Sequence, residues 1–211
     1  MGTTERRERE KQRRRDDILN TARTLFFDKG FRDTTIDDIA RSAELARGTI
    51  YLYFENKEEI YATILEEGLD VLQSLVVASH DDNADALTNL LAGHDAFMRF
   101  HDEYPQYYNV LILDKLQISD VLPMPLKSRL DGKTMDMAEW IARNLEKGIK
   151  EGIFRPMQTR EVAFLQMGMA MGFAQMLDKC GAVNDIFADR EQSRQAMHAL
   201  IANGLIERKE H

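Results

Sequence analysis

Hydrophobic residues recur at helical spacing along most of this chain. The segment that holds Ile36, Ile39, Ala40 and Ala43 shows the spacing clearly, and such spacing is typical of an amphipathic helix. No stretch shows the sustained alternation that would indicate a strand, and the prolines are confined to positions 105, 123, 125 and 156. The pattern therefore predicts an all-α protein of about nine helices.

The expected helices are separated by glycines, prolines and polar clusters. Gly30 and Gly152 are placed to end the helices before them, and Pro105 forces a boundary. The long helices are expected over about residues 14–29, 57–79, 86–103, 106–118, 126–151, 159–179 and 190–207. A pair of short helices is expected within 35–54, and loops within 80–85, 119–125, 152–156 and 181–189.

The segment from Thr35 to Lys57 carries the clearest local signals. Thr35 precedes an apolar-periodic run and Asp38 lies three residues later, so the two can form a helix N-cap with an acidic partner. A second short helix begins near Ala46, and Lys57 opens a longer one. Two short helices joined by a tight turn, the second with hydrogen-bond donors on its outer face, are the layout of a helix-turn-helix.

At these residues the chain resembles the TetR family of one-component transcriptional regulators. The likeness covers the N-terminal part of the chain, through the segments 18–22 (ILNTA), 25–31 (LFFDKGF), 34–40 (TTIDDIA), 48–54 (GTIYLYF) and 56–60 (NKEEI). The resemblance implies an N-terminal three-helix helix-turn-helix domain and a variable C-terminal helical bundle that binds a small effector and forms a homodimer. We expect a basic flexible arm over 1–13, the DNA-binding domain over 14–56, and the ligand-binding and dimerisation domain over 57–211.

The turn of the expected helix-turn-helix departs from the pattern common in that family, Ala-Gly-Val-Ser. This chain has Ala43, Glu44, Leu45 and Ala46 instead. Glu44 would cost on the order of 1 kcal/mol if it adopts the left-handed conformation that a glycine accepts freely. Ala46 cannot cap the second helix, which loses about 1 kcal/mol.

The second helix of the pair, over 46–54, is expected to read DNA in the major groove. Arg47 can bind guanine through two hydrogen bonds, Gly48 lets the backbone approach the DNA, and Lys57 suits a phosphate at a helix N-terminus. Ile50, Leu52 and Phe54 are expected to pack inward, whereas Tyr51 suits either a phosphate or the core. The candidate DNA-contacting residues are Arg14, Thr34, Thr35, Arg47, Gly48, Thr49, Tyr51, Tyr53 and Lys57.

The distribution of charge is compatible with DNA binding, although the net charge is -8. Residues 1–60 hold 13 basic and 13 acidic residues, so the whole excess of acid lies in 61–211. Residues 5–15 hold seven basic and three acidic side chains. Such an arm would attract phosphate; alternatively, it is a solvated tail.

Soft and aromatic side chains are frequent in the C-terminal part, which holds most of the 11 methionines. These residues could simply form the core, but methionine-rich cavities also adapt to apolar ligands. By the resemblance we expect a small apolar or aromatic effector. Its candidate contacts are Phe97, Phe100, His101, Tyr104, Tyr108, Trp140, Phe164, Met167 and Met171.

The helices expected over 159–179 and 190–207 are candidates for a four-helix dimer interface. Small residues there would let helices approach closely, or would serve packing within one chain. The candidate interface residues are Leu165, Gly168, Met169, Gly172, Met176, Met197, Leu200, Ile201 and Leu205.

Taken together, these patterns predict a ligand-responsive regulator, most simply a repressor, that binds a palindromic double-stranded DNA operator. We expect no enzymatic activity, cofactor or metal, because the sequence has no nucleophile elbow, phosphate-binding glycine loop or cysteine cluster. The alternative is an all-helical metal-dependent enzyme or carrier that uses His94 and His101, which lie seven residues apart and are each followed by Asp.

The expected location is the cytoplasm, without a membrane partner. No apolar run reaches membrane-spanning length, and the charged N-terminal residues do not suit a secretory signal. The single cysteine, Cys180, excludes an intramolecular disulfide.

Overall fold

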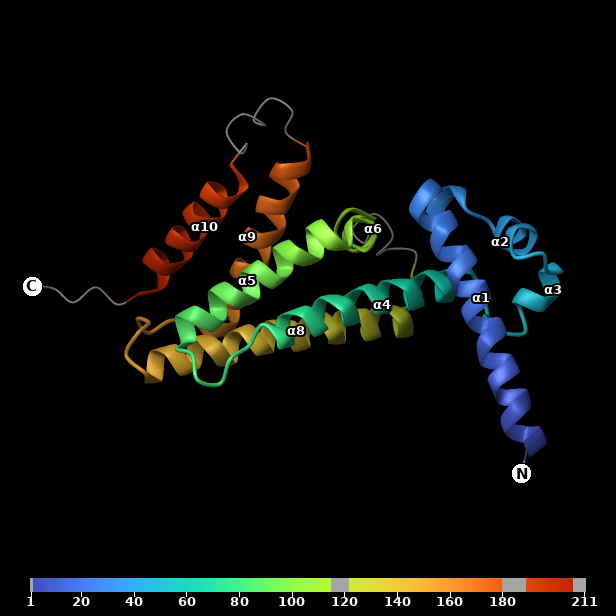
Figure 1. Ribbon diagram of the computed structural model, residues 1–211, viewed down its shortest axis with the longest axis horizontal. Helices are drawn as coiled ribbons and strands as arrows, with labels where there is room; N and C mark the ends of the chain where they lie inside the picture. The colour runs from blue at the N-terminus through green and yellow to red at the C-terminus, as the bar shows by residue number, and fades with distance from the viewer. Residues whose placement is uncertain (1, 115–121, 180–188, 207–211) are drawn as a thin grey trace, which may run out of the picture. The chain divides into compact units, whose positions relative to one another are not determined.

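The computed structural model describes residues 2–114, 122–179 and 189–206, and these form nine α-helices, one π-helical segment and no strand (Figure 1). This confirms the all-α class. The elements are α1 Gly2–Asp33, α2 Ile36–Ser42, α3 Arg47–Ile50, α4 Lys57–Ala78, α5 Ala86–Glu103, α6 Pro105–Tyr108, η1 Asn109–Asp114, α8 Met124–Lys150, α9 Thr159–Lys179 and α10 Arg190–Leu205. None of the described helices is long and apolar enough to cross a membrane.

Most helix boundaries follow local signals in the sequence. Asp85 caps α5 by accepting a hydrogen bond from the Thr88 backbone N–H at 2.7 Å. The chain leaves α8 through Gly152, whose φ of 70° favours glycine. Pro105 separates α5 from α6, and α4, α5 and α9 match their predicted ranges within about one residue.

Two predicted boundaries are wrong. The first helix was expected to begin near Arg14, but α1 begins at Gly2, so the segment expected as a flexible arm is helical. Charged residues with high helix propensity explain this extension, together with pairs four residues apart such as Arg6 and Glu10 at 2.9 Å. The reading helix expected over 46–54 is only α3, Arg47–Ile50, and turns follow it at 51–53.

The helix expected over 106–118 is also replaced. The structure has the short helix α6 and then the π-helical segment η1, which ends at Asp114. The rest of that predicted helix, the predicted loop over 181–189 except Asp189, and Cys180 lie outside the described residues.

The described residues fall into two compact units. One contains those within Met1–Leu69 and Gln106–Gly132, and the other those within Asp70–Pro105 and Lys133–His211. Helices α4 and α8 each contribute residues to both units.

The first unit packs α1, α2, α3 and the start of α4 around an aromatic cluster. The Tyr61 ring lies 4.9 Å from the centroids of both Phe26 and Phe31. Ile50 and Phe54 are buried, as predicted. Leu52 is 75% exposed, so its predicted packing role is wrong: the chain has left α3 for a turn there, and its side chain no longer follows the buried face of the helix.

The core of the second unit lies among α5, the later part of α8, α9 and α10. Leu90, Leu145, Phe154, Ile201 and Leu205 are buried together there. Phe154 packs so closely that a Cβ on Gly148 would lie 2.1 Å from its ring. Ile201 and Leu205, predicted as interface residues, are therefore core residues of their own chain.

Candidate DNA-binding surface and effector pocket

The start of α2 is fixed by the capping box that the sequence predicted. The Thr35 hydroxyl accepts from the Asp38 backbone N–H at 3.1 Å, and the Asp38 carboxylate accepts from the Thr35 backbone N–H at 3.1 Å and from its hydroxyl at 2.7 Å. These hydrogen bonds favour the ionised carboxylate and lower the pKa of Asp38. These hydrogen bonds fix the first turn of α2, which also carries the exposed side chain of Asp37.

The turn between α2 and α3 shows both features that the sequence predicted, a left-handed Glu44 and an N-cap without a capping side chain. Glu44 has a φ of 55°, in the left-handed region. Ala46 is the N-cap of α3 and makes no side-chain capping hydrogen bond. The turn is held by backbone hydrogen bonds instead, including Leu45 N–H to the Ala40 carbonyl at 2.9 Å.

Arg47, at the start of α3, lies in an exposed polar network. One terminal guanidinium nitrogen lies 3.2 and 3.3 Å from the two carboxylate oxygens of Asp37. The other terminal nitrogen donates to the Tyr51 hydroxyl at 3.2 Å. Tyr51 and then Asp37 raise the pKa of Arg47, so the guanidinium is held charged and at the surface.

The other candidate DNA contacts on this motif differ in how accessible they are. Gly48 is exposed, with open space where a Cβ would lie. Thr35 and Tyr51 are exposed, whereas Thr49 and Tyr53 are half-buried. On α1, Arg14 is exposed and the guanidinium of its neighbour Arg15 lies 4.7 Å from the centre of the Phe54 ring.

Thr34 does not fit the predicted DNA-contacting role, because its side chain is fully buried. Its hydroxyl donates to the Gly30 carbonyl at 2.8 Å, at the place where Gly30, with a φ of 78°, interrupts α1. Thr34 is therefore a structural residue that satisfies the backbone at the end of α1.

Lys57 is engaged at the same place. Its ammonium group donates to the carbonyls of Phe31 at 2.8 Å and Thr34 at 2.9 Å, and lies 4.1 Å from the centre of the Phe31 ring. Partial burial is the main cause that lowers its pKa. Lys57 therefore joins the start of α4 to the end of α1, and its predicted contact with phosphate stays a prediction.

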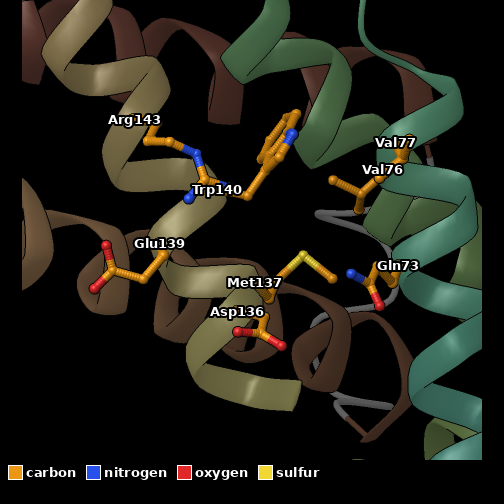
Figure 2. Close-up of a pocket in the computed structure, with 8 residues that line it drawn as sticks. All are labelled: Gln73, Val76, Val77, Asp136, Met137, Glu139, Trp140 and Arg143. Carbon is orange, nitrogen blue, oxygen red and sulfur yellow. The ribbon is translucent and has the colours of Figure 1, made fainter. Parts of the chain in front are cut away.

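A pocket of about 340 Å³ opens in the second unit between α4 and α8 (Figure 2). Met137 of α8 points toward Gln73 of α4, and Trp140 forms part of the wall. The Trp140 ring is also held edge-on by His80, with ring centroids 5.9 Å apart. The lining residues are Gln73, Val76, Val77, Asp136, Met137, Glu139, Trp140 and Arg143.

Among the predicted effector contacts, Trp140 lines this pocket and the other eight do not. Phe100, His101 and Tyr108 are buried, and Tyr108 belongs to the first unit. Phe164 is 45% exposed on α9, so the structure does not place it in a cavity. The remaining side chains are half-buried or at the surface: Phe97, Tyr104, Met167 and Met171.

The structure does not bring His94 and His101 together, as the alternative of a metal-dependent enzyme or carrier would need. The ring nitrogens of His101 lie 2.7 Å from an Asp102 oxygen and 2.9 Å from an Asp178 oxygen. Seven residues along an α-helix correspond to a rise of roughly 10 Å, and the ring of His94 lies instead 5.8 Å from that of His198. The two histidines of α5 therefore belong to different side-chain clusters.

Several of the predicted interface residues form an exposed apolar face on α9. Leu165 is 65% exposed, Met169 is exposed, and Gly168 and Gly172 have open space beside them. On α10, Leu200 is 66% exposed. Met176 is exposed as well, and Met197 is half-buried against the core.

The comparisons with known proteins agree with this architecture. The family model described as bacterial regulatory proteins, tetR family, matches residues 18–64. The HTH-type transcriptional regulator YfiR of Bacillus subtilis is 33% identical over 158 residues, which cover 70% of this chain and 71% of YfiR. The fold and the motif define a helix-turn-helix regulator, and the chain belongs to the TetR family of transcriptional regulators.

Other relatives carry more specific descriptions. The transcriptional repressor KstR2 of Mycolicibacterium smegmatis is 28% identical over 147 residues, which cover 68% of each chain. The negative regulator IcaR of the Staphylococcus epidermidis biofilm operon is 38% identical over 69 residues, covering 33% of this chain and 37% of IcaR.

Solved structures show the same fold. A tetR-family regulatory protein from Rhodococcus RHA1 has a TM-score of 0.75 at 17% identity, covering 93% of this chain and 98% of its own. AibR, solved with isovaleryl coenzyme A and operator DNA, has a TM-score of 0.70 at 20% identity, covering 89% and 97%.

Proposed function

We propose that this chain is a ligand-responsive transcriptional repressor that binds a palindromic operator as a homodimer. The observation that carries the proposal is the arrangement of the α2–α3 motif. Arg47, Gly48 and Tyr51 share its exposed surface, while Ile50 and Phe54 anchor it to the core. KstR2, described as a repressor, and IcaR, described as a negative regulator, support repression as the direction of the regulation.

Arg47 is the residue that we assign to base recognition. A guanidinium can donate to the O6 and N7 atoms of guanine in the major groove. Its hydrogen bonds to Asp37 and Tyr51 keep it extended beside α3 in the free protein. Binding to a guanine through both terminal nitrogens would exchange Asp37 and Tyr51 for the base, since each of them now accepts from one of those nitrogens.

Phosphate contacts would come from the rest of the motif and from the basic N-terminal turns of α1. Thr35, Thr49, Tyr51 and Tyr53 supply hydroxyl groups, and Arg14 supplies a charge. Such contacts position the protein without reading sequence. Their loss would weaken specific and non-specific binding alike and reduce the salt dependence.

The pocket between α4 and α8 is our candidate effector site. Val76, Met137 and Trp140 offer an apolar wall, while Gln73 and Arg143 can orient a polar group. The fit is to a small molecule with an apolar or aromatic body and a polar end. Solved neighbours whose ligands are given, such as AibR with isovaleryl coenzyme A, support regulation by a small molecule.

The pocket can influence DNA binding through α4. This helix runs from Lys57, which is bonded to the end of α1, to Gln73 and Val76 in the pocket wall. A ligand that binds better to one tilt of α4 would shift the population of head positions, and by linkage would weaken operator binding.

Dimerisation is assigned to the exposed face of α9 that contains Leu165, Gly168, Met169 and Gly172, with Leu200 of α10. Apolar side chains beside glycines suit close helix packing against a second copy of the chain. A two-fold dimer would require an inverted repeat in its operator. We place this function in the cytoplasm, where its DNA target would be.

The proposal is tested by selecting bound duplexes from a random pool and sequencing them. The expected result is an inverted repeat with half-sites about one helical turn apart, roughly 34–36 Å. Selected pools without any repeated motif would contradict it, and would favour a non-specific DNA-binding protein that contacts phosphates alone. The selected operator would then serve to screen small molecules for release.

A further inference from the structure

One group of metal-ligating side chains among the described residues connects α5 to α10. His94, Asp95 and His198 each bring one ligand atom to it, and these atoms lie within 4.8 Å of one another. The rings of His94 and His198 meet edge to face, with centroids 5.8 Å apart. The proposed DNA-binding and effector sites use none of these residues.

His94 is the part of this group that ordinary packing does not explain. The residue is 8% exposed, and its two ring nitrogens are buried without a hydrogen bond to any described residue. Buried polar atoms in proteins almost always have a partner. Burial, and then the nearby His198, lower the pKa of His94 to about 4.

Asp95 and His198 are already oriented toward each other. The His198 Nε2 atom lies 2.8 Å from one Asp95 oxygen, and the other oxygen accepts from Arg194 at 3.1 Å. Arg194 is in turn held by Glu191, at 2.6 and 2.9 Å. Arg194 therefore fixes one oxygen of the Asp95 carboxylate and leaves the other on the side of His198, and carboxylates that bind metals are themselves held by such hydrogen bonds.

We propose that His94, Asp95 and His198 bind a divalent transition-metal ion of the zinc class. Two imidazole nitrogens and one carboxylate oxygen form a ligand set that suits zinc with a fourth position open to water. Magnesium and calcium prefer oxygen ligands throughout, so they fit this group poorly. The ion would take the place of the hydrogen bond between His198 and Asp95, with the proton of that bond released to solvent, and would cross-link α5 to α10.

The geometry requires only a small adjustment. Two ligand atoms bonded to a tetrahedral zinc ion lie roughly 3.3 Å apart, so the 2.8 Å contact between His198 and Asp95 must widen slightly. His94 must close from within 4.8 Å of the other ligand atoms. Arg194 brings a positive charge near the ion, but its pairing with Glu191 offsets that charge.

The test is a titration of the untagged full-length chain, stripped with a chelator, with Co²⁺ and then with competing Zn²⁺. We expect one Co²⁺ per chain, with the intense visible absorption of a four-coordinate ion, displaced by Zn²⁺. His94→Leu and His198→Gln should each weaken binding at least tenfold. His80→Gln is the matched control, because His80 also faces a carboxylate, that of Asp82 at 3.3 Å, but lies outside the group.

A second readout keeps the outcome independent of folding defects. Leucine can fill the buried position of His94, so circular dichroism should show an intact helical fold in His94→Leu. Zn²⁺ should raise the Tm of the wild-type chain and of His80→Gln, and leave the Tm of His94→Leu and His198→Gln unchanged. Absence of stoichiometric binding by the folded wild-type chain, or binding that survives both substitutions, would overturn the proposal.

Discussion

Arg47 shows how one side chain can be held ready for a partner without being buried. Its guanidinium is hydrogen-bonded to Asp37 and Tyr51, all on exposed parts of the α2–α3 motif. An exposed pair of this kind adds little to stability, so exchanging the Asp37 carboxylate for a base, as we propose, would cost the fold little. The expected cost of removing Arg47 therefore falls on binding and not on folding.

Arg47→Ala should weaken specific operator binding by about 1–3 kcal/mol and relax the preference at one base position in each half-site. Fluorescence anisotropy on the operator and on operators altered at that position measures both effects. Arg99→Ala is the control, because Arg99 is also an exposed arginine paired with a carboxylate but lies on α5. Equal losses for the two variants would contradict the assignment of Arg47.

Thr34 and Lys57 are predicted DNA-contacting residues whose side chains make hydrogen bonds within the fold. Lys57→Met keeps the aliphatic stem but removes two charge-assisted hydrogen bonds to the Phe31 and Thr34 carbonyls. The free energy of unfolding should fall by about 1–3 kcal/mol, measured by urea denaturation. Thr34→Val should also lower it, since the Gly30 carbonyl loses its donor. An unchanged stability in Lys57→Met would contradict the structural role, and weaker DNA binding in that variant would support the predicted phosphate contact.

At the scale of elements, the turn from α2 to α3 is a weak point that the sequence itself reveals. Ala46 stands at the N-cap without a capping group. Ala46→Ser should raise the free energy of unfolding by about 0.5–2 kcal/mol, because a serine hydroxyl can accept from the first free N–H groups of α3. Ala46→Val is the matched control, since valine cannot cap. A serine variant no more stable than the valine variant would show that the turn is already satisfied.

The helix boundaries that could be predicted are those with a chemical cause nearby. Thr35 and Asp38 predicted the start of α2, Pro105 predicted the end of α5, and Gly152 predicted the end of α8. The π-helical segment after Tyr108 has no such local signal. The end of α3 at Ile50, where turns follow, has no such signal either.

Which face of a helix is buried could be predicted less well. Leu200 and Ile201 are adjacent apolar residues that were both predicted at the interface, yet Leu200 is exposed and Ile201 is in the core. Contacts between segments that are distant in the sequence could not be predicted. His94 meets His198 and not His101, and Gln73 joins Trp140 in the pocket wall, although no spacing in the sequence connects either pair.

At the scale of the whole molecule, the proposed function depends on assembly of two chains. The exposed face of α9 should be covered by the second copy, so Leu165→Glu should shift the protein from dimer to monomer. Sedimentation velocity measures this directly. Met124→Glu, at an exposed apolar residue outside α9, is the control and should stay dimeric. Dimers that persist in Leu165→Glu would place the interface elsewhere.

Sequence-specific recognition of a two-fold operator is the claim on which this account rests most heavily. It is tested most directly by measuring the affinity of the wild-type dimer for the selected inverted repeat, for one half-site and for a scrambled duplex at the same salt concentration. We predict that the full repeat binds two chains and is bound at least roughly 10³-fold more tightly than the scrambled duplex, with the half-site in between. Equal affinity for all three duplexes would contradict the account and leave only binding to phosphates.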